Sequence, residues 1–253
     1  MDIAKPAMSS ITFTTALTQK IARTPGTMSF RFVRPPGFEY LAGQWFALGL
    51  PPGSLPADSV DGPLDKHFTF SSSPTEPFLE FTTRLTGSPF KEAMRALEPG
   101  SEVHVQAPFG GFVLRATMEK VVFLAAGIGV TTVRSILRFA ADTHDRRPMV
   151  LLYGNTSEAT ITFREDLDQI AGSFPHLKLV HVLSAPDPDW TGHSGHLSED
   201  LIRTEIGETA AWTFMVSGPP SMVEALRSML DGLGVERAQM VFERYEGYRA
   251  FIS

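Results

Sequence analysis

The sequence contains no cysteine, and basic side chains are fewer than acidic ones. A chain without cysteine cannot form disulfides, bind zinc through thiolates or hold an iron–sulfur cluster by itself. There are 22 Lys and Arg against 28 Asp and Glu, which gives a net charge of −6. This balance argues against a broad nucleic-acid surface, because such a surface needs a basic field.

Long hydrophobic runs are also missing. The longest, Val121–Ala126, has the length of a strand, far short of the roughly 20 apolar residues that a membrane helix needs. The segment Met1–Pro6 has no apolar run behind a basic cluster, so it does not resemble a secretory signal. We therefore expect no membrane segment, and a cytoplasmic protein. The oligomeric state is left open.

What is present is enough apolar material for a large core, with 43% hydrophobic residues in 253. Up to about residue 117 the apolar residues alternate with polar ones in the ranges 28–32, 79–85 and 102–106. Such alternation is typical of half-buried antiparallel strands. Gly and Pro turns separate these ranges, and the range 51–65 is predicted to be a long loop. Many short strands at this spacing predict an antiparallel Greek-key β-barrel over residues 1–117.

The spacing of the apolar residues changes near residue 118. Near-continuous apolar runs follow at 121–126, 149–153, 177–183, 212–216 and 239–242. Such runs are typical of parallel strands buried on both faces. Between them, helical spacing is found in the ranges 133–140, 163–171 and 222–233, the last with Met222, Leu226, Met229, Leu230 and Leu233 on its buried stripe. Residues 118–253 are thus predicted to form an open parallel α/β sheet with a C-terminal tail.

Two short segments in the second half combine a strand end with glycine. Gly127-Ile128-Gly129-Val130-Thr131 follows a predicted strand and opens a helix, where free N–H groups can bind an anion. Ser217-Gly218-Pro219-Pro220 lies between another strand and helix, with Pro220 suited to the first helical turn. For each of them a tight turn without a ligand is the competing interpretation.

Two segments in the first half carry aromatic, hydroxyl and basic groups together. Lys66-His67-Phe68-Thr69 can stack a planar ring and bond its edge, although a plain edge strand explains it as well. Thr86-Gly87-Ser88-Pro89-Phe90-Lys91 opens a predicted helix with Ser88 as N-cap, and its free N–H groups would also suit a pyrophosphate. A helix cap without a ligand is the simpler interpretation here.

Taken in order, the four segments resemble those of the ferredoxin–NADP reductase-type flavoprotein superfamily. The resemblance extends from about Ile11 to about Glu243. It implies a flavin-binding barrel over residues 1–117 and an NAD(P)-binding α/β domain over residues 118–253. In this resemblance Lys66-His67-Phe68-Thr69 stands where the superfamily has Arg-x-Tyr-Ser/Thr, and Ser217 stands where it has Cys.

The resemblance also implies site residues. Phe68 would stack on the flavin, the Thr69 hydroxyl would lie near flavin N5, and Lys66 would face a phosphate. The flavin phosphates would further be met by Gly87, Ser88, Phe90 and Lys91. The nicotinamide cofactor would be bound by Gly127, Gly129, Thr131, Gly154, Asn155, Gly218 and Pro219. The catalytic group would comprise Thr69, Ser217 and Glu243.

The implied cofactor is FAD rather than FMN, with NADH or NADPH as substrate. NADH is favoured, because Thr156 and Ala185 hold positions where a 2′-phosphate would call for Arg or Lys. The implied activity is hydride transfer from NAD(P)H to flavin and delivery of electrons to a separate acceptor, a protein such as ferredoxin or a small molecule. A reductase of free flavins and an electron-transfer subunit without its own nicotinamide turnover remain alternatives.

Other function classes find little support. His193 and His196 flank a glycine in a predicted loop and lack the spacing of metal ligands, so no metal is expected. No Gly-x-Ser-x-Gly motif is present, and no nucleic-acid partner is expected.

Overall fold

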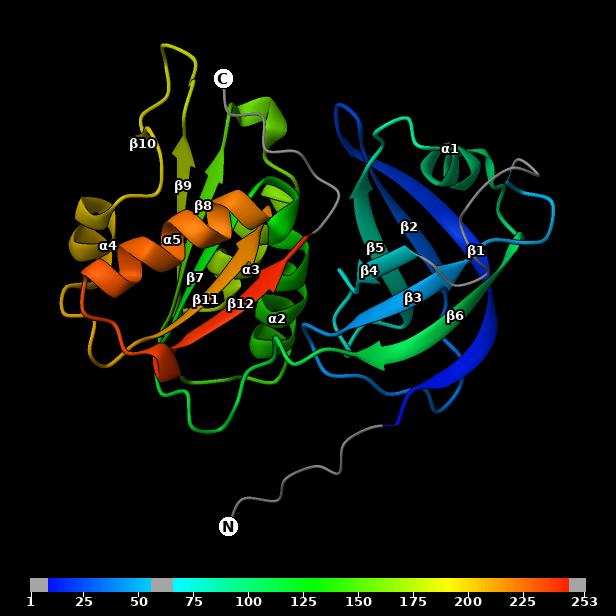
Figure 1. Cartoon of the computed structure of the whole chain (residues 1–253), viewed down its shortest axis with the longest axis horizontal. Helices are drawn as coiled ribbons and strands as arrows, with labels where there is room; N and C mark the ends of the chain where they lie inside the picture. The colour runs from blue at the N-terminus through cyan, green and yellow to red at the C-terminus, as the bar shows by residue number, and fades with distance from the viewer. Residues whose placement is uncertain (1–8, 56–65, 246–253) are drawn as a thin grey trace.

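The computed structural model describes residues 9–55 and 66–245. The segment Met1–Pro6, the second part of the predicted loop at 51–65 and the tail after Tyr245 lie outside the described residues. Two six-stranded sheets stand side by side (Figure 1); the first encloses one hydrophobic core and the second has one core on each face. The change in the spacing of apolar residues near residue 118 thus corresponds to a change from one sheet to the other.

The first sheet is antiparallel and has the strand order β4-β3-β6-β1-β2-β5. Its strands are β1 (Ile11–Thr24), β2 (Thr27–Val33), β3 (Trp45–Gly49), β4 (Lys66–Thr69), β5 (Phe78–Arg84) and β6 (Glu102–Phe109). The two ends of this order meet, because Ser71 N donates to the Glu80 carbonyl at 2.7 Å and the rings of Phe68 and Phe81 stack at 4.3 Å. The sheet therefore closes into a barrel, which confirms the predicted architecture.

Alternation explains most of the barrel core but fails in β5. In β6, Val103 and Val105 are buried while Glu102 and His104 are exposed, as expected. In β5 the polar residues are buried as well, since Glu80 is only 1% exposed. Its carboxylate accepts hydrogen bonds from Arg23, Arg31 and Ser71. The prediction of a half-buried strand was wrong here, because this polar network covers the face that the pattern assigned to solvent.

The second sheet is parallel and has the order β10-β9-β8-β7-β11-β12. Its strands are β7 (Val121–Ala126), β8 (Met149–Asn155), β9 (Leu177–Leu183), β10 (His193–Ser194), β11 (Thr213–Gly218) and β12 (Met240–Arg244). The order reverses at β7, so the next strand along the chain lies on one side of β7 and β11 on the other. In open α/β sheets, ligands bind at the carboxyl ends of the strands at such a switch point.

Helices cover both faces of the parallel sheet (Figure 1). The core on one face includes α2 (Val130–Asp142) and α3 (Arg164–Ser173), and the core on the other includes α4 (Glu199–Ile206) and α5 (Pro220–Gly232). The predicted stripe of α5 needs correction. Val223, Leu226 and Leu230 are its buried residues, whereas Met222 and Met229 are only partly buried. The spacing i, i+3, i+7 from Val223 faces the sheet, so the stripe is rotated from the predicted one.

The two sheets are joined by α2, whose side chains reach the barrel. Arg134 is 4% exposed, forms an ion pair with Glu76 and donates to the Ser71 carbonyl at 3.0 Å. Ser135 donates to the Ser72 carbonyl at 2.6 Å. These buried contacts fix the orientation of one sheet against the other. Among the described residues, no helix is long and apolar enough to cross a membrane.

Candidate active site between the two sheets

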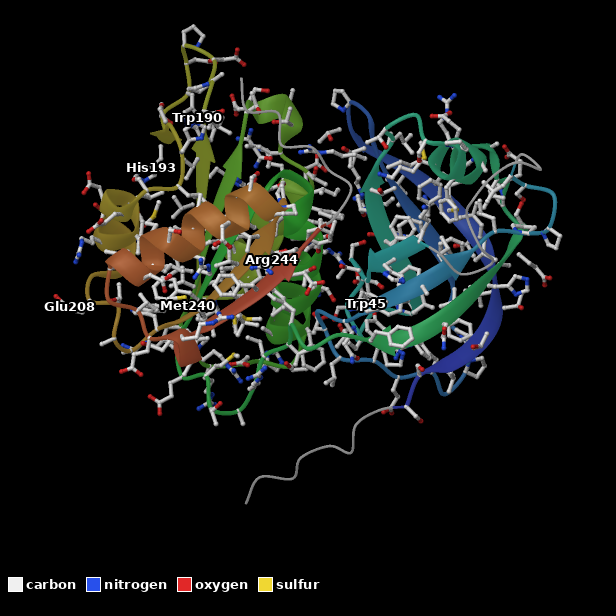
Figure 2. All side chains as sticks on the ribbon, viewed as in Figure 1. Trp45, Trp190, His193, Glu208, Met240 and Arg244 are labelled. Atoms are coloured by element: carbon white, nitrogen blue, oxygen red, sulfur yellow. The ribbon has the colours of Figure 1, made fainter. Side chains whose placement is uncertain are left out.

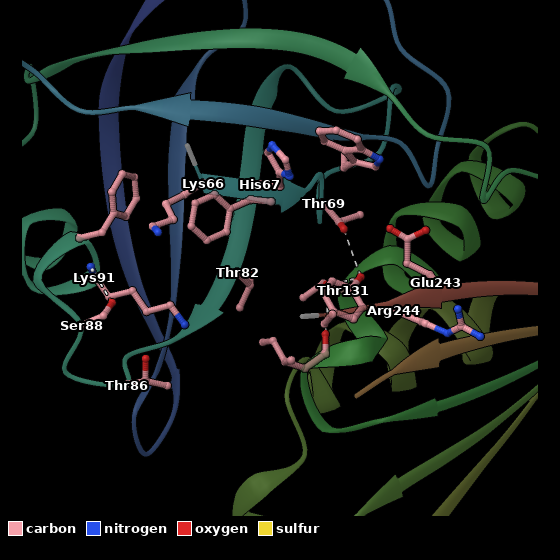
Figure 3. A pocket seen from close by; sticks show the side chains of 15 residues that line it. Lys66, His67, Thr69, Thr82, Thr86, Ser88, Lys91, Thr131, Glu243 and Arg244 are labelled. Carbon is pink, nitrogen blue, oxygen red and sulfur yellow. Dashed lines mark hydrogen bonds between the residues drawn. The ribbon is translucent and has the colours of Figure 1, made fainter. Parts of the chain in front are cut away.

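A hollow of about 740 Å³ lies where the barrel meets the carboxyl ends of the parallel strands (Figure 3). Both halves of the chain contribute to its walls. From the barrel side it is lined by Trp45, Lys66, His67, Phe68, Thr69, Thr82, Thr86, Ser88, Phe90 and Lys91. From the other side it is lined by Ile128, Thr131, Glu243, Arg244 and Tyr245. Its volume falls in the range typical of small-molecule and cofactor sites.

The barrel wall places the ring of Phe68 between the basic residue Lys66 and the hydroxyl residue Thr69. All three residues lie on β4, where Phe68 is half-buried and Thr69 is 5% exposed. The Phe68 ring packs on Phe81, which fixes its plane. Lys66 lines the same hollow. A planar ring system with an anionic group would find an apolar face, a hydroxyl and a cation here.

The start of α1 (Pro89–Ala96) forms the far end of this wall. Ser88 caps the helix, since its hydroxyl accepts from Lys91 N at 3.4 Å. Gly87 precedes it with φ of +73°, a left-handed conformation that glycine adopts without strain. Phe90 is buried under the hollow and Lys91 lines it. Helix N–H groups and a lysine therefore converge on one place, which suits a phosphate.

The glycine segment after β7 forms a 3-10 turn, η1 (Gly127–Gly129), that leads into α2. A Cβ atom on Gly129 would stand 2.2 Å from the Ser217 carbonyl oxygen, so only glycine fits there. The buried Ser217 hydroxyl in turn donates to the Gly129 carbonyl at 2.9 Å. β11 and the turn are thus held together by the two residues that the sequence singled out.

The end of β8 carries an amide without partners. The side-chain nitrogen and oxygen of Asn155 are both buried and form no hydrogen bond within the described residues. Next to it, the Tyr153 hydroxyl donates to the Gly127 carbonyl at 3.0 Å, which ties β8 to the glycine turn. Buried polar atoms usually have a partner, so an unpaired amide at a strand end points to a ligand that completes it.

Two titratable side chains line the hollow at the end of the chain's last described strand: Glu243 lies in β12, and Tyr245 follows it directly. Burial raises the pKa of Glu243 from its ordinary 4.5 to about 7. The Tyr245 hydroxyl lies 3.1 Å from the Thr69 hydroxyl and 3.2 Å from that of Thr131, and it also bonds the Thr132 hydroxyl. Burial raises the pKa of Tyr245 too, and the nearby Glu243 charge adds to the shift. The strand end therefore presents one group that titrates near neutrality and one that stays protonated.

Comparison with known proteins agrees with this geometry. Residues 123–228 match the family model described as "Oxidoreductase NAD-binding domain". One component of the Na(+)-translocating NADH-quinone reductase of Neisseria gonorrhoeae is 30% identical over 158 residues, which are 60% of this chain and 39% of that protein. The chain thus spans about two fifths of the length of this curated relative.

Solved structures share the fold of both halves of the chain. The flavohem-like FAD/NAD binding domain of nitric oxide dioxygenase from Vibrio cholerae superposes with a TM-score of 0.79 at 19% identity, covering 92% of this chain and 98% of that one. A ferredoxin NADP+ reductase from Neisseria gonorrhoeae superposes with a TM-score of 0.75 at 18% identity, covering 92% and 98%. These structures show that the chain has the two-domain fold of the ferredoxin–NADP reductase-type flavoproteins, and its second half matches the NAD-binding family model. The resemblance inferred from the four segments is thereby confirmed.

The superfamily's motif positions separate into two groups in the structure. Those that line the hollow are Lys66, Phe68, Thr69, Ser88, Phe90, Lys91, Thr131 and Glu243. Those that do not are Gly87, Gly127, Gly129, Gly154, Asn155, Ser217, Gly218 and Pro219. Most of the second group lie at the carboxyl ends of β7, β8 and β11, where they shape the turns. Their roles as site residues stay predictions.

Three residues at or beside this candidate site were not predicted from the sequence. Tyr245 and Thr132, the residue that follows the glycine segment, meet through their hydroxyls. Arg84 ends β5, and its guanidinium lies against Gly127, where a Cβ would stand 2.2 Å from Nη2. Arg84 forms no ion pair with the described residues. A basic residue just before the Thr86-Gly87-Ser88 motif was the available signal for it.

The residues present fit the two cofactors of the superfamily. Phe68 and Thr69 supply a ring and a hydroxyl for a flavin, and the capped start of α1 supplies donors for its phosphates. The glycine turn, Arg84 and the unpaired Asn155 amide supply donors for a nicotinamide dinucleotide. A metal site finds no such support, since no group of three or more potential metal ligands occurs within residues 9–55 and 66–245.

Proposed function

We propose that this chain is an FAD-dependent NAD(P)H oxidoreductase. It takes a hydride from NAD(P)H and passes the electrons on to a separate acceptor. The observation that carries the proposal is the hollow between the sheets, because one cavity joins a flavin-type wall to a nicotinamide-type turn. The proposed boundary between the two units is at residues 117 and 118, between β6 and β7.

On the barrel side, the chain's task is to hold the flavin. Phe68 offers an aromatic face to the ring system, and packing against Phe81 prevents the side chain from turning away. Ser88 and Lys91 hold the phosphates at the start of α1. Lys66 adds a point charge where the superfamily has the planar Arg, so bidentate geometry is lost and charge is kept.

On the α/β side, the chain's task is to orient the nicotinamide dinucleotide. The glycine turn would offer backbone N–H groups to the pyrophosphate, and Arg84 reaches over this turn from the barrel. The Asn155 amide would complete its hydrogen bonds on the ribose. Binding at both walls holds the two reactants in one orientation, and this positioning is the protein's main contribution to rate.

A bound flavin supplies the chemistry of hydride acceptance and electron release. Thr69, Ser217 and Glu243 are the residues we assign to the reacting region. Thr69 holds a hydroxyl at the wall, and Ser217 fixes the glycine turn through Gly129. Glu243, with its pKa near 7, holds or releases a proton at working pH.

NADH is the proposed substrate rather than NADPH. A 2′-phosphate needs a free cation close to the ends of β8 and β9. Thr156 and Ala185 stand there, and the nearby Arg164 is already paired with Glu158. A 2′-phosphate would therefore compete with a carboxylate for that guanidinium. The acceptor remains a protein or a small molecule, and a cytoplasmic location remains a prediction from the sequence.

Flavin retention tests the proposal directly. Purified chain incubated with FAD is expected to leave gel filtration yellow, with a flavin spectrum in the protein peak. A protein that binds no added flavin would refute the proposal. A protein that loses FAD on the column yet reduces it in solution with NADH would indicate the reductase of free flavins instead.

Two phenylalanine variants test whether the barrel side of the hollow is what retains the flavin. Phe68→Ala is expected to lower flavin retention, because it removes the aromatic face at the hollow. Phe78→Ala is the control, since Phe78 is a partly buried residue at the start of β5 that does not line the hollow. It is expected to leave flavin retention unchanged.

A further inference from the structure

A second hollow, of about 470 Å³, follows one edge of the parallel sheet. It is lined by Arg115, Arg237, Ala238, Met240, Val241, Phe242 and Arg244. Met240, Val241 and Phe242 are consecutive residues of β12, and successive side chains of a strand point to opposite faces. Because all three line the hollow, it runs along the edge of the strand and does not lie on one face of the sheet.

This edge of β12 is open. β12 is the last strand of its sheet and pairs only with β11. No other strand of the described chain pairs with its outer side. An edge strand presents a row of unpaired N–H and C=O groups, which an extended segment of another protein can join.

The hollow is strongly basic in a chain of net charge −6. Three of its lining residues are arginines, and none is acidic. Arg115 and Arg237 are exposed and form no ion pair with the described residues, while the Arg237 guanidinium packs over the Phe242 ring at 4.8 Å. Arg244 pairs with Glu224 at 3.6 Å, and both side chains are half exposed, so this pair contributes little.

The open edge is also adjacent to the candidate active site. Arg244 lines both hollows, and its neighbours Glu243 and Tyr245 line the first. Figure 2 shows Met240 and Arg244, the first and last residues of β12, with Arg244 at the end nearer the barrel. A protein that docks along β12 would therefore sit against the strand that carries the site's carboxyl group.

We propose that the outer edge of β12, together with Arg115, Arg237 and Arg244, is a docking surface for an extended acidic segment of a partner protein. The backbone of that segment pairs with β12, and its carboxylates bind the guanidinium groups. An extended segment fits better than a small anion, because the hollow continues along the strand and offers both main-chain groups and charge. The partner's identity as electron acceptor rests on the proposed function; the docking surface does not.

Fluorescence anisotropy with labelled peptides tests this surface on the full chain loaded with FAD. The first probe is a peptide of alternating Glu and Val, the second has Lys in place of Glu, and the third has the acidic composition with Pro at alternate positions. The acidic strand-forming peptide is expected to bind at least tenfold more tightly than either of the others. Equal binding of the Pro-containing peptide would overturn pairing with β12, and full displacement by millimolar inorganic phosphate would identify a small-anion site instead.

Two pairs of arginine variants test whether the acidic peptide binds at the second hollow. The double substitution Arg115→Gln with Arg237→Gln is expected to weaken the acidic peptide about tenfold. Arg146→Gln with Arg203→Gln changes the net charge equally at exposed sites elsewhere and is expected to leave affinity within twofold. Equal weakening by both pairs would overturn the surface.

Flavin reduction by NADH, measured on the same proteins, separates the two claims. Arg115 and Arg237 line only the second hollow, so their substitution is expected to leave that rate unchanged. Peptide binding by a protein that NADH cannot reduce would refute the enzyme and leave the docking surface standing. Normal reduction without peptide binding would refute the surface alone.

Discussion

The hydroxyl oxygens of Thr69 and Tyr245 lie 3.1 Å apart, although 176 positions separate the two residues in the sequence. The same phenol also meets the hydroxyls of Thr131 and Thr132 at the start of α2. One side chain from the end of the last strand therefore links the barrel to the nicotinamide side. Its main chain is held as well, because Tyr245 N donates to the Gly218 carbonyl at 3.1 Å.

Removing this phenol oxygen is expected to cost stability. Tyr245→Phe leaves the threonine hydroxyls without a shared partner, so the free energy of unfolding should fall by about 1–3 kcal/mol. Thr132→Val removes the hydroxyl that the Tyr245 phenol contacts at the start of α2. In chemical denaturation, the two substitutions together are expected to cost less than the sum of the single effects, with a coupling of at least about 0.5 kcal/mol. Strict additivity would show that the two hydroxyls do not interact.

Glu243 predicts a specific pH dependence of stability. Its pKa is raised from 4.5 to about 7 in the folded chain, so folding favours the protonated form. The contribution of Glu243 to the free energy of unfolding is therefore complete below pH 4.5 and is lost as the pH rises through 7. Glu243→Gln should nearly match the wild type at or below pH 4.5 and be more stable at about pH 8 by roughly 3 kcal/mol. Denaturation curves at both pH values provide the check, and an equal difference at the two would contradict the assigned shift.

Two glycine substitutions separate a close contact from a general loss of flexibility. Gly129→Ala places a methyl group 2.2 Å from the Ser217 carbonyl oxygen, so the turn must move. We expect NADH-dependent flavin reduction to fall at least tenfold while flavin retention persists. Gly172→Ala in α3 meets nothing within 4 Å and should raise helix stability by about 0.5–1 kcal/mol without changing the rate. Unchanged reduction by the Gly129 variant would mean that the turn does not bind the nucleotide.

Arg84 is expected to act on nucleotide binding rather than on flavin binding. Its guanidinium lies against Gly127, where the pyrophosphate is proposed to bind. Arg84→Gln should raise KM for NADH about tenfold, the effect of losing one charge-assisted contact of about 1.4 kcal/mol. Steady-state kinetics should show little change in kcat. Arg95→Gln, on the exposed side of α1, removes the same charge and is the matched control. Equal KM values for both variants would remove Arg84 from the site.

The architecture could be predicted because it follows from local patterns. The alternation in β6 and the apolar run of β7 differ in period, and that difference separates an antiparallel barrel from a parallel sheet. The N-cap at Ser88 and the first-turn position of Pro220 were likewise predictable, since they depend on neighbouring residues only. The burial of Glu80 was not, because its partners Arg23 and Arg31 come from other strands.

The candidate site was predictable only where a motif is continuous in sequence. Phe68 and Thr69 on β4 were singled out this way and line the hollow, whereas Gly127 and Gly129 do not line it and their roles stay predictions. The contacts of Tyr245 with Thr69 and Thr132, and of Arg84 with Gly127, depend on how the two sheets are set against each other. That orientation is determined by buried pairs such as Arg134 with Glu76, which no local pattern reveals.

Anaerobic mixing of the FAD-loaded chain with NADH, and separately with NADPH, tests the central claim most directly. Stopped-flow absorbance of the flavin is the readout, so no acceptor is needed. We predict that the flavin bleaches in a single turnover and that NADH does so at lower concentration than NADPH, because Arg164 is already paired with Glu158. A flavin that stays bound and oxidised with both nucleotides would contradict the proposed function.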